Sequence, residues 1–161
     1  MTIAEQIVSL INQKLAGINT VDIGTVTKVY DNYMRVDVRL KCSVNGTETL
    51  LQNVPFMSLR FGDSEIIVLP DVGQPVLVAY TKFERSKQLE GDGVAPVNPR
   101  SRFQLSNAVV LGSIHLRSDG IPEDLSAPGD IGIFHKSGSC ILFKSDGKIE
   151  IRTTQLDINS L

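Results

Sequence analysis

Residues 1–18 carry apolar side chains at helical spacing. Four of them recur at every fourth position: Ile3, Ile7, Ile11 and Leu15. This period predicts an amphipathic helix with one apolar face. Thr2 and Glu5 form a capping-box pattern at its start, because each side chain can pair a backbone N–H that the first turn leaves open, and Gly17 suits its end. The apolar face must pack on the body of the protein or on a neighbouring subunit.

Between residues 19 and 116 the spacing becomes alternating, as in strands. The clearest run places Met34, Val36, Val38 and Leu40 on one side and Arg35, Asp37, Arg39 and Lys41 on the other. Other short strands are predicted over 21–30, 47–54, 66–69 and 76–80, with a last strand, or a short helix and a strand, in 105–116. Asp31-Asn32 and Asn45-Gly46 supply turns, and 84–102 is a long loop. This spacing of short strands favours an antiparallel OB-like barrel domain over 19–116.

Residues 117–130 are rich in Gly and Pro and are expected to form a linker. Over 131–161 the apolar residues then come as spaced alternating pairs, separated by turn residues: Ile131 and Ile133, Ile141 and Phe143, Ile149 and Ile151, and Leu156 and Ile158. The repeat is roughly eight to ten residues long, enough for one strand and one turn. Each such strand is expected to have a single apolar face.

Two arrangements could bury these faces. One is a four-stranded meander within the chain, but such a meander has no second layer in the chain to cover it. The other is three chains wound around one axis, which would bring the faces together and give every strand edge a partner. We therefore expect a homotrimeric, intertwined β-helix whose axis is filled by the apolar pairs from Ile131 to Ile158.

Composition adds little to this picture. The 161 residues hold 16 Lys and Arg against 18 Asp and Glu, and the formal net charge of -2 gives no basic face for nucleic acid. Cys42 and Cys140 are too few and too far apart for a disulfide framework or a zinc site. No apolar run approaches the ~18 residues of a membrane span, and the N-terminal stretch lacks signal-peptide features, so synthesis in the cytosol is expected.

The sequence contains no enzyme motif. His115 and His135 are the only histidines, both within alternating patterns, and no H-x-H, H-E-x-x-H, G-x-S-x-G or P-loop pattern occurs. The carboxylates of 119–130 could bind calcium, but a solvated acidic loop is the better interpretation. We expect neither catalysis nor a cofactor. One rival function for an OB-like barrel is single-stranded nucleic-acid binding, which the lack of Trp and the few other aromatics disfavour.

Five segments of the chain, taken in this order and with the turn residues between their strands, match the pattern of a known family. They are 21–26 (VDIGTV), 34–38 (MRVDV), 51–56 (LQNVPF), 69–78 (LPDVGQPVLV) and 102–110 (RFQLSNAVV). In these segments the sequence resembles the central spike, or membrane-piercing protein, of contractile-tailed bacteriophage baseplates. In that family they belong to an N-terminal OB-fold domain, and a tail similar to 129–152 forms an intertwined triple-stranded β-helix.

The resemblance implies a mechanical role. The barrels of three chains would form a base docked under the tail hub or tube. The β-helix would be a rigid needle that sheath contraction drives through the host cell envelope. Such a protein is assembled in the host cytoplasm and resides in the virion baseplate. The helix stripe from Ile3 to Leu15 would dock on the hub or close the trimer base. The family's tip often holds an iron through an H-x-H motif, which this sequence lacks. The tip would then be metal-free and blunt, or supplied by another protein, or the chain would be a shortened form.

Overall fold

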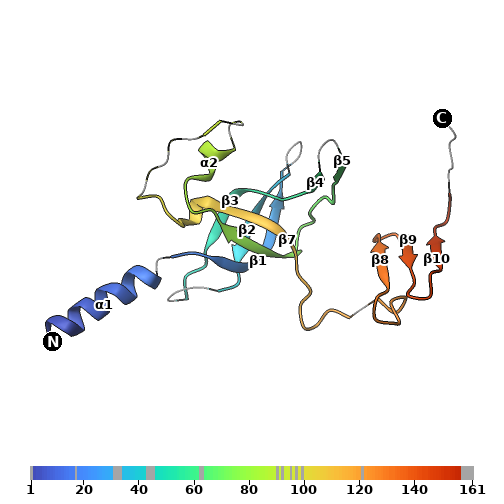
Figure 1. Cartoon of the computed structure of the whole chain (residues 1–161), viewed down its shortest axis with the longest axis horizontal. Coiled ribbons are helices and arrows are strands. Elements are labelled where there is room, and N and C mark those ends of the chain that lie inside the picture. The colour runs from blue at the N-terminus through green and yellow to red at the C-terminus, as the bar shows by residue number, and fades with distance from the viewer. Residues whose placement is uncertain are drawn as a thin grey trace. The chain divides into compact units, whose positions relative to one another are not determined.

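The computed structural model describes residues 2–16, 18–30, 34–42, 46–61, 64–89, 91, 93, 94, 96, 98, 100–120 and 122–156. The chain divides into two compact units, Met1–Leu116 and Arg117–Leu161 (Figure 1). It is mainly β, with an N-terminal helix and a curled antiparallel sheet, which confirms these features of the predicted fold. Several residues used in the predictions lie outside the described residues: Gly17, Asp31, Asn32, Asn45 and Ile158.

Helix α1 spans Ile3–Ala16, and its first turn has the predicted capping box. The Thr2 N–H donates to Glu5 Oε2 at 2.7 Å, and the Glu5 N–H donates to Thr2 Oγ1 at 3.3 Å. These bonds satisfy two donors that have no partner within a helix. Every side chain from Thr2 to Leu15 is exposed, so none of the apolar residues from Ile3 to Leu15 packs into the core of its own unit.

The first unit is built on a five-stranded antiparallel sheet in the order β3-β2-β1-β6-β7. Its strands are β1 (Val21–Val29), β2 (Arg35–Leu40), β3 (Leu50–Pro55), β6 (Pro75–Tyr80) and β7 (Ala108–Ser113). The sheet curls until its two edges meet. Phe56, directly after β3, forms a parallel bridge with Val110 of β7, and the Met57 N–H donates to Val110 O at 2.9 Å. The curled sheet therefore encloses its own core.

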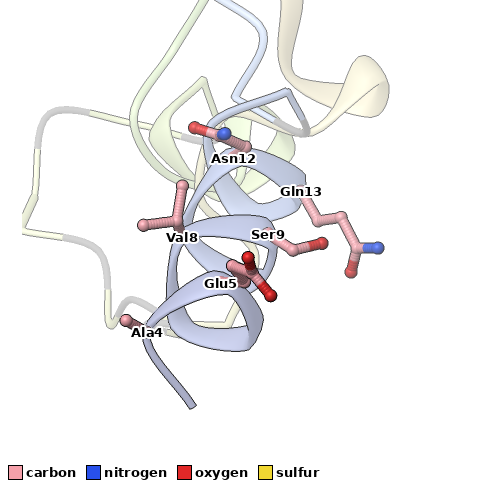
Figure 2. A pocket seen from close by; sticks show the side chains of 6 residues that line it. All are labelled: Ala4, Glu5, Val8, Ser9, Asn12 and Gln13. Carbon is pink, nitrogen blue, oxygen red and sulfur yellow. The ribbon is translucent and has the colours of Figure 1, made fainter. Parts of the chain in front are cut away.

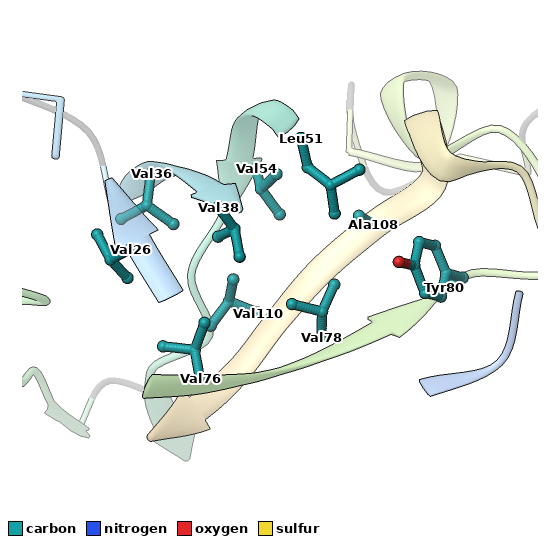
Figure 3. Close-up of a cluster of buried hydrophobic side chains, with 10 residues drawn as sticks. All are labelled: Val26, Val36, Val38, Leu51, Val54, Val76, Val78, Tyr80, Ala108 and Val110. Carbon is teal, nitrogen blue, oxygen red and sulfur yellow. The ribbon is translucent and has the colours of Figure 1, made fainter. Parts of the chain in front are cut away.

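The inward side chains of these strands form that core, and most of them are valines at alternating positions (Figure 3). The buried cluster consists of Val26, Val36, Val38, Leu51, Val54, Val76, Val78, Tyr80, Ala108 and Val110. β-Branched side chains suit this place because their stiff χ1 angles pack well on a pleated surface. Val36 and Val38 are fully buried, as the alternation of that strand predicts.

Asp37 is buried, although it lies between Val36 and Val38 and outside the core cluster that these two valines join. Its Oδ1 accepts hydrogen bonds from the Asn53 N–H at 2.8 Å and from the Tyr30 hydroxyl at 3.0 Å. The register of β2 with β3 shifts here: Val36 pairs with Val54 and Val38 with Leu51, so two residues of β3 stand opposite Asp37. The carboxylate therefore ties the end of β1 and strand β3 to β2.

The strand predicted over 66–69 is displaced. β4 (Leu59–Phe61) and β5 (Ser64–Ile66) form a separate two-stranded hairpin, and 67–69 is not a strand. The chain turns back earlier than the apolar run suggests, and the end of that run is left exposed beyond the hairpin.

The other predicted elements differ less from the observed ones. β3 begins three residues later than predicted. The predicted loop 84–102 contains a short helix, α2 (Arg85–Gln88). Within 105–116 the structure has the short helix and strand that were one of the two predicted alternatives, namely η2 (Leu105–Asn107) followed by β7.

The second unit contains a three-stranded antiparallel sheet in the order β10-β9-β8. The strands β8 (Ile131–Phe134), β9 (Cys140–Phe143) and β10 (Ile149–Arg152) follow one another as a meander. Gly138 and Gly147 have positive φ angles in the two turns. Glycine adopts this conformation without steric cost, which is why the chain can reverse so tightly there.

Gly24 in β1 tests how closely the curled sheet is packed. A Cβ there would overlap the fully buried Val38 side chain and lie 3.0 Å from Arg39 O. We therefore expect Gly24→Ala to lower the free energy of unfolding by about 1–3 kcal/mol in urea denaturation. Gly91→Ala is the matched control, because a Cβ at Gly91 meets nothing within 4 Å. Equal stability of the two variants would contradict the close packing at Gly24.

Candidate functional site

One face of the three-stranded sheet is apolar and exposed. Directly opposed residues of neighbouring strands share a face of a sheet. The pairing of β9 with β8 and β10 creates two cross-strand rows on this face: Ile131, Phe143 and Ile149, and then Ile133, Ile141 and Ile151. These six side chains are between 37% and 62% exposed. We call this surface the apolar face. All six residues belong to the predicted trimer axis.

The opposite face of the same sheet is covered within the chain. Leu142 of β9 is fully buried there. A Cβ at Gly132 would overlap the Phe134 ring and lie 3.1 Å from Leu125 Cδ2, so these two side chains cover that face. The expectation of a single apolar face is therefore wrong for β9, which is apolar on both sides. Leu125 belongs to the segment 117–130, predicted as a linker, and supplies part of a second layer.

A charged cluster holds the covering segment in place. Asp130 Oδ1 accepts the Ser145 N–H at 2.8 Å, and Asp130 Oδ2 lies 3.2 Å from Lys144 Nζ. The N–H groups of Ser126 and Ala127 also donate to Oδ2, at 3.2 and 3.3 Å. The Asp130 side chain is only 2% exposed. The Ser145 N–H, together with the Lys144 ammonium and the other two N–H groups, holds the pKa of Asp130 well below its usual range.

A polar row continues the apolar face. The next positions of the same alternation are His135, Ser139 and Thr153, and the Ser139 hydroxyl donates to Thr153 Oγ1 at 3.4 Å. His135 Nδ1 lies 2.8 Å from Ser137 Oγ. His135 and His115 are both exposed, but neither lies in a strand, although the alternating patterns around them predict strands. Among the described residues, no three His, Cys, Asp or Glu side chains gather as a metal site would require.

The fourth predicted pair stands apart from the strands. Leu156 follows β10 in irregular backbone and is 58% exposed. It lines a shallow hollow at the edge of the apolar face together with Ile133, Ile141 and Ile151. Ile158 lies outside the described residues. The structure therefore brings six of the eight predicted axis residues into one surface, with Leu156 beside it.

Helix α1 presents a second exposed apolar surface. Its predicted docking residues, Ile3, Ile7, Ile11 and Leu15, are 77%, 53%, 51% and 59% exposed. Another side of the helix, shown in Figure 2, is a shallow hollow lined mostly by small or polar side chains: Ala4, Glu5, Val8, Ser9, Asn12 and Gln13. The helix is therefore amphipathic, as predicted, and its apolar stripe is uncovered by the described residues.

A third apolar surface, which was not predicted, lies on the β4–β5 hairpin. Leu59 and Ile66 are paired across it and are 53% and 64% exposed. Met57 and Val68, which lie in non-strand backbone just outside the two strands, are 46% and 68% exposed. The alternation within each arm is visible in the sequence, but the surface becomes visible only when the register of the hairpin is known.

The fold and these surfaces define a class: a mainly β protein of two units, with apolar surfaces that its described residues leave uncovered. No model of a known protein family matches the chain, and no curated protein matches it. No helix in the described part of the chain has both the length and the apolar character needed to cross a membrane. Function must therefore be inferred from the surfaces themselves.

The Asp130 cluster predicts how the second unit responds to acid. Folding lowers the pKa of Asp130. The ionised carboxylate therefore stabilises the fold above about pH 4, near the pKa of an unfolded aspartate, and this contribution is lost as the pH falls below that value. We expect the buried Cys140 to react faster with a dipyridyl disulfide, which labels thiols in acid, as the pH is lowered from about 5 to about 2.

Two variants make this measurement specific. Asp130→Asn should raise the labelling rate of Cys140 at neutral pH and flatten its dependence on acid. Asp146→Asn is the control, because Asp146 lies in an exposed turn, and it should leave both unchanged. All proteins carry Cys42→Ser, which removes the exposed thiol. An unaltered acid response in Asp130→Asn would show that the cluster does not govern this unit.

Proposed function

We propose that the protein is the structural central spike of a bacteriophage tail baseplate, or of a phage-like contractile injection system. A homotrimer of this chain caps the tail tube or hub and pierces the host cell envelope, without catalysis or a cofactor. The observation that carries the proposal is the apolar face. It consists of two cross-strand rows of large side chains, on a sheet whose other side is already covered. Exposed apolar surfaces of this kind are typical of interaction sites.

A second and third copy of the chain are the partners that this face fits. Fully burying an Ile or Phe side chain contributes about 1.5–3 kcal/mol of stabilising free energy. Burying the remaining exposed area of these six roughly half-exposed side chains would therefore contribute about 6 kcal/mol per chain. Association costs on the order of 4–15 kcal/mol. The apolar face alone thus supports a marginal trimer at most, and further contacts between the chains must add to it.

The same trimer solves the problem of open strand edges. β8 and β10 are the two edges of the three-stranded sheet, and an unpaired edge invites uncontrolled association. In an intertwined β-helix, each edge pairs with a strand of a neighbouring chain and the apolar faces fill the axis. A closed, fully hydrogen-bonded prism is stiff. Stiffness is the property that a needle needs when sheath contraction supplies the work.

The first unit forms the base of the proposed spike as an OB-fold barrel. Its five strands, with the parallel bridge between Phe56 and Val110, are compatible with a partly open five-stranded barrel. Helix α1 either docks on the hub or tube or closes the base of the trimer. The proposed location is the virion baseplate after assembly in the host cytoplasm, and the tip is metal-free or completed by a separate protein.

The oligomeric state tests the proposal directly. Light scattering on the purified protein should give about three times the 17.6 kDa mass of the chain. The measurement should be repeated over a hundredfold range of concentration, since the apolar face alone is marginal. A monomer or a dimer throughout that range would rule out the spike.

Two substitutions test which surface forms the axis. Phe143→Asp and Ile149→Asp should each abolish the trimer, because burying an unpaired charge on a dry axis costs several kcal/mol, on the order of the whole contribution of the face. Lys136→Asp is the control: it places the same side chain in an exposed turn outside the apolar face and should leave the mass unchanged. Trimers that persist in both face variants would show that the chains meet elsewhere.

Single-stranded nucleic-acid binding by the first unit is the alternative function. A titration with a labelled single-stranded oligonucleotide at low salt separates the two. The spike predicts no binding. Tight binding that weakens steeply as salt is added would favour the alternative, because release of counterions from phosphates gives that dependence.

A further inference from the structure

Two arginine side chains of the first unit meet at one carbonyl group. Arg35 Nη1 donates to Asn53 O at 3.3 Å, and Arg85 Nη2 donates to the same oxygen at 3.4 Å. Arg85 Nη1 also donates to Ala108 O. The Arg85 guanidinium is therefore held between β3, which contains Asn53, and the first residue of β7. Neither arginine forms an ion pair with a carboxylate of the described residues.

This pair of positive charges lacks a counter-charge. A guanidinium has five N–H donors, and the described part of the chain offers those of Arg85 two acceptors, both neutral carbonyl groups. Partial burial, and then the charge of Arg35, lower the pKa of Arg85, because both disfavour its charged form. An anionic group beside Arg85 would supply both a further acceptor and the missing charge.

Arg85 and Ser106 line two neighbouring hollows beside β3. The first hollow, of about 250 Å³, has apolar walls that include Leu50 and Leu105. The second, of about 400 Å³, is polar and includes the Gln104 side chain. The Ser106 hydroxyl has no hydrogen-bond partner among the residues that the structure describes. A ligand that reached both hollows would therefore meet apolar side chains on one side, and a cation with a hydroxyl donor on the other.

The outer edge of β3 is open along these hollows. β3 is the first strand in the order β3-β2-β1-β6-β7, so β2 pairs with one side of it only. Its pairing with β7 is the single bridge at Phe56, beyond its last residue, Pro55. In the described chain, no strand pairs with the outer side of β3 itself. The backbone groups of such an edge can pair with an extended segment of another protein.

We propose that this edge binds an extended segment of a partner protein, with a carboxylate side chain against Arg85 and an apolar side chain against Leu50 and Leu105. Charge complementarity selects the carboxylate, since a guanidinium matches its planar geometry. Residues two apart in an extended segment point to the same side and lie about 7 Å apart. An acidic and an apolar residue at this spacing therefore suit two neighbouring hollows. The site belongs to the first unit and does not depend on the trimer of the proposed function.

The carboxylates around the site give the test a direction. Glu84 lines the polar hollow, where its Oε1 accepts the Ser86 hydroxyl at 3.0 Å. Its negative charge opposes an incoming carboxylate. Asp37 is buried and accepts the Asn53 N–H and the Tyr30 hydroxyl. Removal of the Glu84 charge should therefore strengthen binding, whereas removal of the Arg85 charge should weaken it.

Fluorescence anisotropy with the full-length protein tests the proposal. The probe is a labelled peptide, Glu-Thr-Leu-Thr-Glu, in which an acidic residue stands two positions from Leu in either chain direction. The matched peptide Gln-Thr-Leu-Thr-Gln should bind at least tenfold more weakly, because it cannot form the charge-assisted contact. Glu-Thr-Ser-Thr-Glu should bind at least threefold more weakly than the probe, because it lacks the apolar side chain.

Three variants locate the site. Arg85→Gln should weaken binding of the probe at least tenfold. Lys87→Gln is the matched control, because Lys87 is exposed on the same helix and lines neither hollow. It changes the net charge equally and should alter binding by less than twofold. Glu84→Gln should strengthen binding at least threefold, an increase that a loosened fold would not produce.

Equal binding of the acidic and the amide peptide, or equal losses in Arg85→Gln and Lys87→Gln, would overturn the inference. So would a labelled single-stranded oligonucleotide that binds more tightly than the probe and loses this binding in Arg85→Gln, since that result would assign the site to phosphate. Light scattering on the same samples separates the two proposals. A trimer that does not bind the acidic peptide removes only this inference, and a monomer that binds it removes only the proposed function.

Discussion

A strand that is apolar on both sides needs cover on both sides, and β9 imposes this requirement on the whole second unit. Leu142 points to one side and is fully buried, with Phe134 and Leu125 covering that face. Ile141 and Phe143 point to the other side, where the described chain offers no cover. Three strands of four residues each cannot enclose a core of their own. The described residues of the second unit therefore leave this side of the sheet uncovered.

The charged cluster around Asp130 makes this arrangement definite. Lys144 and Ser145, which follow β9 directly, donate to Asp130, and Asp130 also accepts from Ser126 and Ala127 beside the covering Leu125. The residues that end β9 therefore also position the segment that covers its inner face. Charge-assisted hydrogen bonds of this kind add geometric specificity, so the cluster helps to hold the covering segment on one side of the sheet.

Much of this structure could be predicted from the sequence where local rules decide. The capping box of α1 depends only on Thr2 and Glu5, and it forms as predicted. The alternation of β2 predicts the burial of Val36 and Val38. In the second unit, every second residue of β8, β9 and β10 lies on the same face. The two tight turns bring the apolar positions of one strand directly opposite those of the next.

The remaining features depend on contacts between distant residues. Asp37 is buried because β3 has an extra residue opposite it and the Asn53 N–H donates to its carboxylate, and no pattern within β2 shows this. Leu125 lies in a Gly- and Pro-rich segment with no period, so its packing on the sheet is visible only in three dimensions. The exposed apolar pair of the β4–β5 hairpin, Leu59 and Ile66, is not apparent from the sequence because the apolar run predicts one strand over 66–69, whereas only its first residue lies in β5.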